Sequence, residues 1–265
     1  MIVREAPPYD EFVRAWKALR GKNALSVREV ACVAADRTLL VAEIAVPDTP
    51  VVALAAGVHG DEPAAPWALL SIVRDGLLDP AFSYRLWPCT NPSGYIAGTR
   101  SNAEGVDVNR SFGRGGTTPE ARAIITANRD RRFALSLDLH EDYEASGFYC
   151  YEPKTQPGRL FGPAIVGALT EAGYALQAFS SCYDLGYAPE AREHFSCEPG
   201  RVVYDPAHDL VQFSGMPYSV YMFRRAAARV MTFESAGSIC WEDRIAMHRV
   251  AVLTALKELR NLTNP

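Results

Sequence analysis

Two short motifs, far apart in the sequence, carry side chains of the types that can bind metal ions. The run His-Gly-Asp-Glu places His59 three residues before Glu62, and His140 follows an apolar segment at 133–139. Zinc accepts this mixture of nitrogen and oxygen ligands, and three protein ligands leave a fourth position for water, as catalytic zinc sites require. A single His-x-x-Glu pair is, however, more often the start of a helix than a metal site. The motifs that follow along the chain decide between the two interpretations.

Three further motifs appear in a fixed order. Residues 91–112 contain Asn-Pro-Ser-Gly, then Arg100, then Asp-Val-Asn-Arg at 107–110, and the late apolar run Val-Met-Thr-Phe ends at Glu234. Together with the histidines, this order resembles the zinc carboxypeptidase family, in which His-x-x-Glu, Asn-Pro-x-Gly, Arg, Asp-x-Asn-Arg, a later His and a late Glu follow one another. The resemblance covers the chain from about residue 51 to its C-terminus.

The resemblance implies one zinc ion per chain, held by His59, Glu62 and His140. It also implies that Asp107 accepts the second ring N–H of His59, which would fix the tautomer of that ligand. Asp107 could instead simply cap a turn in its loop.

The remaining family positions imply roles in catalysis and substrate binding. Arg100 would polarise the scissile carbonyl, Asn109 and Arg110 would bind a substrate carboxylate, and Glu234 would act as the general base. The alternatives are ordinary polar residues of a surface loop for the first three, and a buried ion pair for Glu234.

A tyrosine that faces the substrate in larger family members has no single counterpart here. Tyr218 and Tyr221 both lie in the corresponding region, Ser-Gly-Met-Pro-Tyr-Ser-Val-Tyr-Met-Phe. Tyr218 is the preferred candidate for substrate binding, and the alternative is that it packs beside Met216 and Phe223.

Two other functions remain open. An N-acyl amino-acid amidohydrolase similar to succinylglutamate desuccinylase or aspartoacylase would share the metal ligands and the late Glu, but those enzymes usually carry a β-rich domain after it. Only about thirty residues follow Glu234, and they read as one helix. A binding protein that has lost turnover is the third possibility. The expected substrate is therefore a small peptide, or alternatively an acyl amino acid, with a free carboxylate.

The elements that must position these residues alternate between strands and helices. Strands are expected at 27–33 and 38–46 as a hairpin, and at 51–58, 84–88, 133–139, 148–151 and 230–234. Helices are expected at 9–19, 62–74, 118–131, 158–172 and 241–262, with a loop-rich stretch at 180–215. This pattern predicts an α/β fold, an α/β/α sandwich around a mixed, mostly parallel sheet. A single domain over 1–265 is expected, with residues 1–47 packed on its edge.

Composition narrows the class of partner. The chain has 265 residues, 48% hydrophobic residues and a formal net charge of -4, so it offers no basic surface for a nucleic acid. No segment approaches about 18 consecutive apolar residues, and the N-terminus lacks the pattern of a secretory signal, which predicts a cytoplasmic protein without a membrane partner. The sequence leaves the oligomeric state open.

Cysteines and the other histidines match none of these motifs. The six cysteines lack CxxC spacing and are expected to be free, mostly buried thiols. His194, His208 and His248 are expected to be surface or core residues rather than ligands.

Overall fold

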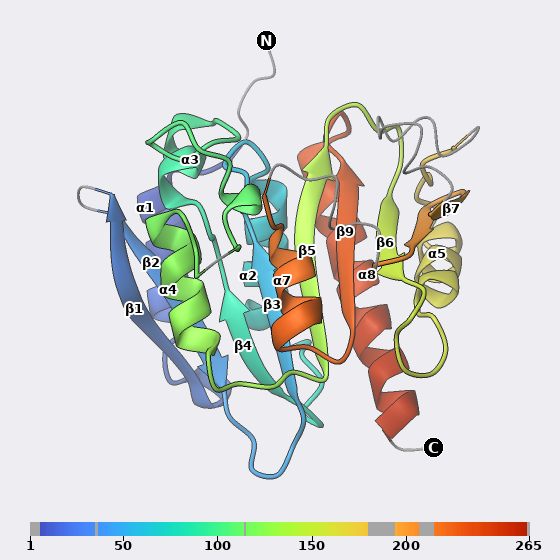
Figure 1. Cartoon of the computed structure of the whole chain (residues 1–265), viewed down its shortest axis with the longest axis horizontal. Coiled ribbons are helices and arrows are strands. Elements are labelled where there is room, and N and C mark those ends of the chain that lie inside the picture. Colours follow the sequence, from blue (N-terminus) through green and yellow to red (C-terminus); the bar gives the residue numbers. More distant parts are fainter. Residues whose placement is uncertain (1–5, 35–36, 114, 180–193, 207–214, 264–265) are drawn as a thin grey trace.

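The fold is built on one mixed β-sheet. The computed structural model describes residues 6–34, 37–113, 115–179, 194–206 and 215–263. Within these ranges the sheet has nine strands in the order β1-β2-β4-β3-β5-β9-β6-β8-β7 (Figure 1). The strands are β1 (Leu25–Ala34), β2 (Arg37–Ile44), β3 (Val51–Ala56), β4 (Ser83–Trp87), β5 (Leu135–Asp142), β6 (Tyr149–Pro153), β7 (Phe195–Glu198), β8 (Arg201–Tyr204) and β9 (Val230–Ala236). The four neighbours β4, β3, β5 and β9 run parallel. The β1–β2 hairpin joins β4 antiparallel, while on the other side β6 is antiparallel to β9, β8 is parallel to β6, and β7 is antiparallel to β8.

Helices cover both faces of this sheet, as the sequence predicted. They are α1 (Tyr9–Ala18), α2 (Ala64–Arg74), α3 (Pro92–Ala97), α4 (Pro119–Asn128), α5 (Gly162–Glu171), α7 (Tyr218–Arg225) and α8 (Trp241–Thr263). Side chains of α1, α2, α5 and α8 share one apolar cluster with one sheet face, and those of α4 and α7 share a second cluster with the other face. In Figure 1, α4 and α7 lie in front of the sheet. The predicted α/β sandwich is therefore confirmed.

Successive side chains of a strand point to opposite faces, so one sheet packs against the helices on both sides. On β5 the residues Leu135, Leu137 and Leu139 belong to the larger apolar cluster, so the residues between them must face the other side. On β9 Met231 and Phe233 do the same, which turns Thr232 and Glu234 to the side of α7.

The parallel strands bring the candidate residues to one edge of the sheet. Strand β3 ends three residues before His59, while His140 and Glu234 occupy paired positions on β5 and β9. Because the carboxyl ends of parallel strands meet at one edge, residues 59, 140 and 234 approach one another there. The strands continue slightly beyond the predicted ends, so His140 lies within β5 rather than directly after it, and two further residues of β9 follow Glu234.

Two regions differ from the sequence expectation. The loop-rich prediction for 180–215 is wrong at its centre, where β7 and β8 form an antiparallel hairpin, while 180–193 and 207–214 lie outside the described residues. The region around Tyr218, for which no element was predicted, forms helix α7. Short polar-apolar strands and an eight-residue helix give weak periodic signals, which is why the pattern missed them.

The cysteine prediction is also wrong at one position. Among the described residues Cys89, Cys150 and Cys240 are free, but Cys197 on β7 is disulfide-bonded. Bond formation depends on which thiols the fold brings into range, and sequence spacing alone does not reveal that.

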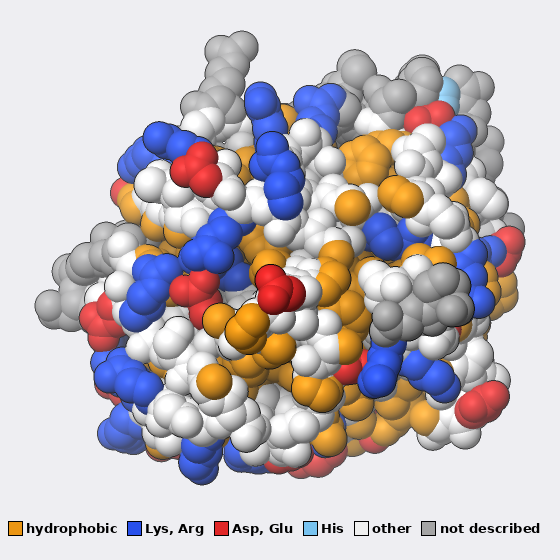
Figure 2. Space-filling model, turned by 90° about the horizontal axis from the view of Figure 1, so that it is seen from below, with side chains coloured by type: hydrophobic (Ala, Val, Ile, Leu, Met, Phe, Trp, Pro, Cys, Tyr) orange, Lys and Arg blue, Asp and Glu red, His pale blue; other side chains and the backbone are white. Residues whose placement is uncertain are grey.

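Surface charges are mixed in sign. Figure 2 shows acidic and basic side chains interspersed with apolar ones on the face seen from below. None of the described helices combines the length and apolarity that crossing a bilayer would take.

Candidate active site

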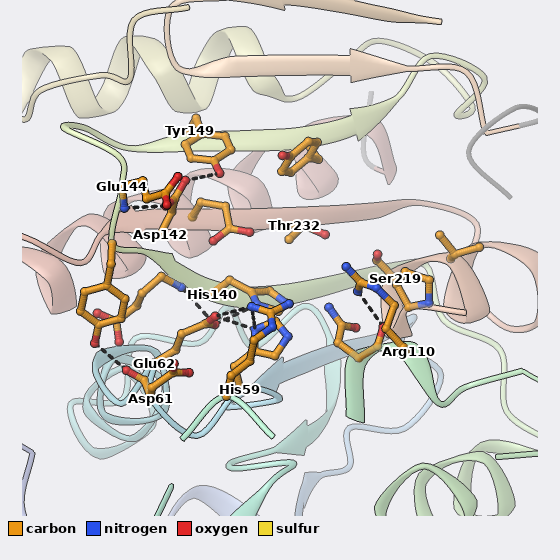
Figure 3. A pocket seen from close by; sticks show the side chains of 18 of the residues that line it. His59, Asp61, Glu62, Arg110, His140, Asp142, Glu144, Tyr149, Ser219 and Thr232 are labelled. Carbon is orange, nitrogen blue, oxygen red and sulfur yellow. Dashed lines mark hydrogen bonds and ion pairs between the residues drawn. The ribbon is translucent and has the colours of Figure 1, made fainter. Parts of the chain in front are cut away.

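Three ligand candidates converge beneath a pocket at the carboxyl edge of the sheet. One ligand atom each from His59, Glu62 and His140 can be chosen so that all lie within 4.8 Å of one another. The Nδ1 atom of His59 lies 2.5 Å from one oxygen of Glu62, and Nδ1 of His140 lies 2.8 Å from the other (Figure 3). All three side chains are buried. Two imidazole nitrogens and one carboxylate are a donor set that zinc accepts, so the residues fit the ion that the sequence predicted.

A close approach of two backbones places the first two ligands. A Cβ atom on Gly60 would lie 1.8 Å from the backbone of Gly94 in α3, so only glycine fits between His59 and Asp61. The Asn-Pro-x-Gly motif holds this contact from the other side. The side chain of Asn91 accepts a hydrogen bond from Gly94 N at 2.9 Å and donates to the carbonyl of Val58 at 3.3 Å.

Each imidazole also meets a carboxylate through its other nitrogen. Nε2 of His59 lies 3.4 Å from Asp107, and Nε2 of His140 lies 3.1 Å from Asp138. Such carboxylates orient ligating imidazoles and increase their basicity. Asp107 also caps the short turn Val108–Arg110 by accepting a hydrogen bond from Asn109 N, so both functions considered for Asp107 have a geometric counterpart.

Asp138 is not among the residues predicted from the sequence. It precedes His140 by two residues on β5, and alternate residues of a strand share a face. That spacing was the available signal, in the run Leu-Asp-Leu-His.

The electrostatics of the cluster favour a cation. Burial alone would raise the pKa of Glu62, but His59 and His140 outweigh burial and hold that pKa well below its ordinary value. Burial lowers the pKa of His140, yet Asp138 and Glu62 more than compensate and raise it well above its usual range. Three carboxylates, those of Glu62, Asp107 and Asp138, therefore surround the two imidazoles, an arrangement that positive charge stabilises.

Glu234 lies in the pocket beside this cluster. It pairs in register with His140 across the β5–β9 ladder, and its side chain lines the pocket. Burial raises the pKa of Glu234 well above its ordinary value, and Glu62, Asp142 and Asp138 add to this effect against the opposing effect of His140.

Two arginines face the same pocket. Arg100 Nη1 lies 3.3 Å from Nδ1 of His59, and the Arg100 guanidinium also contacts Asp107 at 3.1 Å. Arg110 lies at the far end of the pocket next to Ser219 (Figure 3). Asn109 lines the pocket, and its side-chain oxygen accepts a hydrogen bond from Tyr218 N at 2.9 Å, which positions the start of α7.

The preferred tyrosine does not reach the pocket. Tyr218 is 1% exposed and packs edge-on against Phe112 at 5.3 Å, and Tyr221 is buried in the same apolar cluster. Helix α7 turns both rings toward the sheet, and its residues Ser219 and Val220 line the pocket instead. Tyr218 is therefore a packing residue, which was the alternative considered from the sequence.

Other residues that line the pocket belong to none of the sequence motifs. Its cavity has a volume of about 380 Å³, and its acidic end is formed by Asp61, Asp142 and Glu144, with Tyr149 donating a hydrogen bond to Asp142 at 2.7 Å.

His248 on α8 is fully buried, and burial lowers its pKa to about 3, so it is a neutral core residue as expected. His208 lies outside the described residues.

Comparisons with known proteins agree with this geometry. The family model of the succinylglutamate desuccinylase/aspartoacylase catalytic domain matches residues 48–161. Carboxypeptidase SOL1 of Arabidopsis thaliana is 33% identical over 103 aligned residues, which cover 31% of this chain and only 21% of that protein. The matched region is thus about a fifth of the plant protein.

Solved structures resemble the chain over almost its full length. A protein of Shewanella denitrificans for which metallopeptidase activity has been suggested has a TM-score of 0.74 at 21% identity, covering 95% of this chain and 90% of that one. A metallo-carboxypeptidase from Burkholderia cenocepacia has a TM-score of 0.69 at 16% identity, covering 97% and 70%. At such identities the likeness shows the fold. The chain therefore has the fold of these metallopeptidase-like structures, and residues 48–161 are similar to the succinylglutamate desuccinylase/aspartoacylase catalytic domain.

Proposed function

We propose that the chain is a zinc-dependent metallocarboxypeptidase, which hydrolyses the C-terminal peptide bond of a small peptide. The observation that carries this proposal is the convergence of His59, Glu62 and His140 on one point, with Glu234 alongside and Arg110 across the pocket. The three ligand candidates would hold one zinc ion. When bound, zinc supplies Lewis-acid chemistry that lowers the pKa of water toward about 7.

Glu234 is the proposed general base. Its carboxylate takes a proton from the attacking water, whose oxygen bonds to the scissile carbonyl carbon. The same proton then passes to the leaving amine nitrogen as the C–N bond breaks. Because Glu234 pairs with His140 in the sheet, this carboxylate is held by two adjacent strands rather than by a loop.

The arginines divide the binding of substrate between them. Arg100, next to His59, would stabilise negative charge that develops on the carbonyl oxygen. Arg110, with Asn109, would bind the free α-carboxylate, for which a planar guanidinium is well suited. Because Arg100 and Arg110 lie apart along the pocket, a substrate whose α-carboxylate is bound by Arg110 would place its last peptide bond beside Arg100. Cleavage would thus be restricted to the last residue.

A second candidate function is hydrolysis of an N-acyl amino acid. The family model that matches residues 48–161 supports it, because that model describes a succinylglutamate desuccinylase/aspartoacylase catalytic domain. The two functions share the metal, the base and the carboxylate site. They differ in what lies on the acyl side of the bond, where Asp61, Asp142 and Glu144 make the pocket acidic. Acidic acyl groups such as succinyl would be repelled there, which favours the peptidase.

One substrate panel separates the candidates. Peptides with a free C-terminus, the same peptides as C-terminal amides, and N-succinyl and N-acetyl amino acids are assayed with zinc and with excess chelator. The peptidase predicts chelator-sensitive release of the last residue from the free peptides. Faster turnover of the N-succinyl amino acids would favour the acylase, and turnover unaffected by chelator would refute both.

A further inference from the structure

The candidate ligand Glu62 lies directly before a helix whose N-cap residue provides no side-chain cap. Helix α2 begins at Ala64, and its N-cap residue is Pro63, whose side chain accepts no hydrogen bond. The first backbone N–H groups of a helix have no acceptor within the helix, so another part of the molecule must provide one. The position of residues 61–64, and with it that of Glu62, therefore depends on that acceptor.

The end of β5 provides the acceptor. Glu141 follows His140 directly, so its side chain points to the opposite face of the sheet, away from the pocket side. Its carboxylate accepts a hydrogen bond from Ala64 N at 2.6 Å. Its backbone N–H donates to Oε2 of Glu62 at 3.2 Å. One residue of β5 thus contacts both the start of α2 and the carboxylate of the candidate ligand.

Tyr143 makes a third contact with the same segment. Its hydroxyl group donates a hydrogen bond to the backbone carbonyl of Asp61 at 2.5 Å. The ring packs directly on the backbone after β9, because a Cβ atom on Gly237 would lie 2.7 Å from it. Residues 61–64 are therefore held at three points by the end of β5 and the residue that follows it.

Arg244 of α8 holds the Glu141 carboxylate from the other side. Its Nη1 atom lies 2.9 Å from Oε2 of Glu141, and both side chains are almost fully buried. A buried ion pair adds little net stability compared with apolar side chains of the same size. What this pair does add is a fixed position for the carboxylate, and through it for Ala64 N.

We propose that Glu141 and Tyr143 are positioning residues of the metal site. By fixing residues 61–64 they hold the Glu62 carboxylate between the two imidazoles. A ligand that is already in place loses less conformational freedom when the ion binds, so the affinity for zinc depends on both residues. This inference rests on the proposed function, because it requires that Glu62 binds the ion.

A pair of double variants separates positioning from stability. E141Q/R244M and E141M/R244M both lack the buried ion pair and are nearly equal in size. The Gln variant keeps an oxygen that can accept the hydrogen bond from Ala64 N, whereas the Met variant does not. The Gln variant also buries an amide NH2 group, which is costly to desolvate. E141M/R244M should therefore be at least as stable as E141Q/R244M in urea unfolding.

Zinc affinity should follow the opposite order. In a competition titration with a chromophoric chelator, E141M/R244M should bind zinc at least about 10-fold more weakly than E141Q/R244M, as expected for residues that orient metal ligands. The absorption spectrum of the cobalt-loaded proteins reports the ligand geometry. It should change in E141M/R244M and stay close to that of the unsubstituted protein in E141Q/R244M. Equal zinc affinities, or cobalt spectra that do not differ, would overturn the proposal.

Y143F tests the same segment without disturbing the buried ion pair, and it remains decisive where the double variants fail to fold. It should weaken zinc binding at least about 3-fold, because it removes one hydrogen bond to Asp61. Y174F, which removes a phenol hydroxyl after α5 and outside the site, is the control and should leave zinc affinity unchanged. Equal affinities in Y143F and Y174F would likewise overturn the proposal.

The unsubstituted protein separates this inference from the proposed function. If it binds zinc but hydrolyses no substrate of the panel, the proposed hydrolysis is refuted, while weaker zinc binding by the variants still supports positioning. If it binds zinc and cleaves peptides but all variants bind zinc equally tightly, positioning alone is refuted. If it binds no zinc, both are refuted.

Discussion

Asp138, which no motif singled out, should control the affinity of the metal site. Its carboxylate lies 3.1 Å from Nε2 of His140, and its side chain is almost fully buried. At that distance and an effective dielectric constant of about 20, two full charges interact by about 5 kcal/mol, which is an upper bound because a ligating imidazole carries only part of a charge. Carboxylates in this position typically contribute about 10-fold to 100-fold in metal affinity, or about 1.4 to 2.7 kcal/mol. We therefore expect D138N to weaken zinc binding by that factor.

The assay is a competition titration of zinc between the protein and a chromophoric chelator. S136A provides the control, because Ser136 is a buried residue two positions earlier on the same face of β5. The control should keep its zinc affinity within about 2-fold. If D138N binds zinc as tightly as the unsubstituted protein while both variants remain folded, Asp138 does not support His140, and the reasoning is refuted.

Two further outcomes follow from the site and the core. R110A should raise KM at least about 10-fold for a peptide with a free C-terminus but leave KM for its amide nearly unchanged, and equal effects on the two substrates would remove Arg110 from carboxylate binding. L54A should lower the free energy of unfolding in urea by about 2 to 5 kcal/mol, because Leu54 is fully buried in β3. L262A, at a side chain that is 37% exposed, should cost less than about 0.5 kcal/mol, and a loss as large as that of L54A would contradict the assigned core.

The sequence predicted the parts of this molecule that rest on strong local patterns. The segment at 51–56 is continuously apolar because β3 is buried on both faces, and the parallel order of β3, β5 and β9 follows from the helices between them. Ordered motifs then brought His59, Glu62 and His140 together correctly in space, since each sits at the carboxyl edge of a parallel strand or just beyond it.

Features set by register and by tertiary packing were beyond the sequence. The direction of the Tyr218 ring depends on how α7 sits on the sheet, and Asn109 fixes that by bonding to Tyr218 N. Strands β6, β7 and β8 bring Tyr151, Phe195 and Tyr204 together at the pocket, and two of these strands lie in a region expected to be a loop. The spacing of these three residues along the chain does not indicate that their side chains lie together.

The most direct test of the account measures zinc content and turnover together in two variants. We expect E234Q to retain one zinc per chain and lose most of its kcat, and H140A to lose stoichiometric zinc because two ligands rarely hold the ion. Near-normal kcat in E234Q, or full zinc occupancy in H140A, would contradict the assignment of a metal held by residues 59, 62 and 140 with Glu234 as its base.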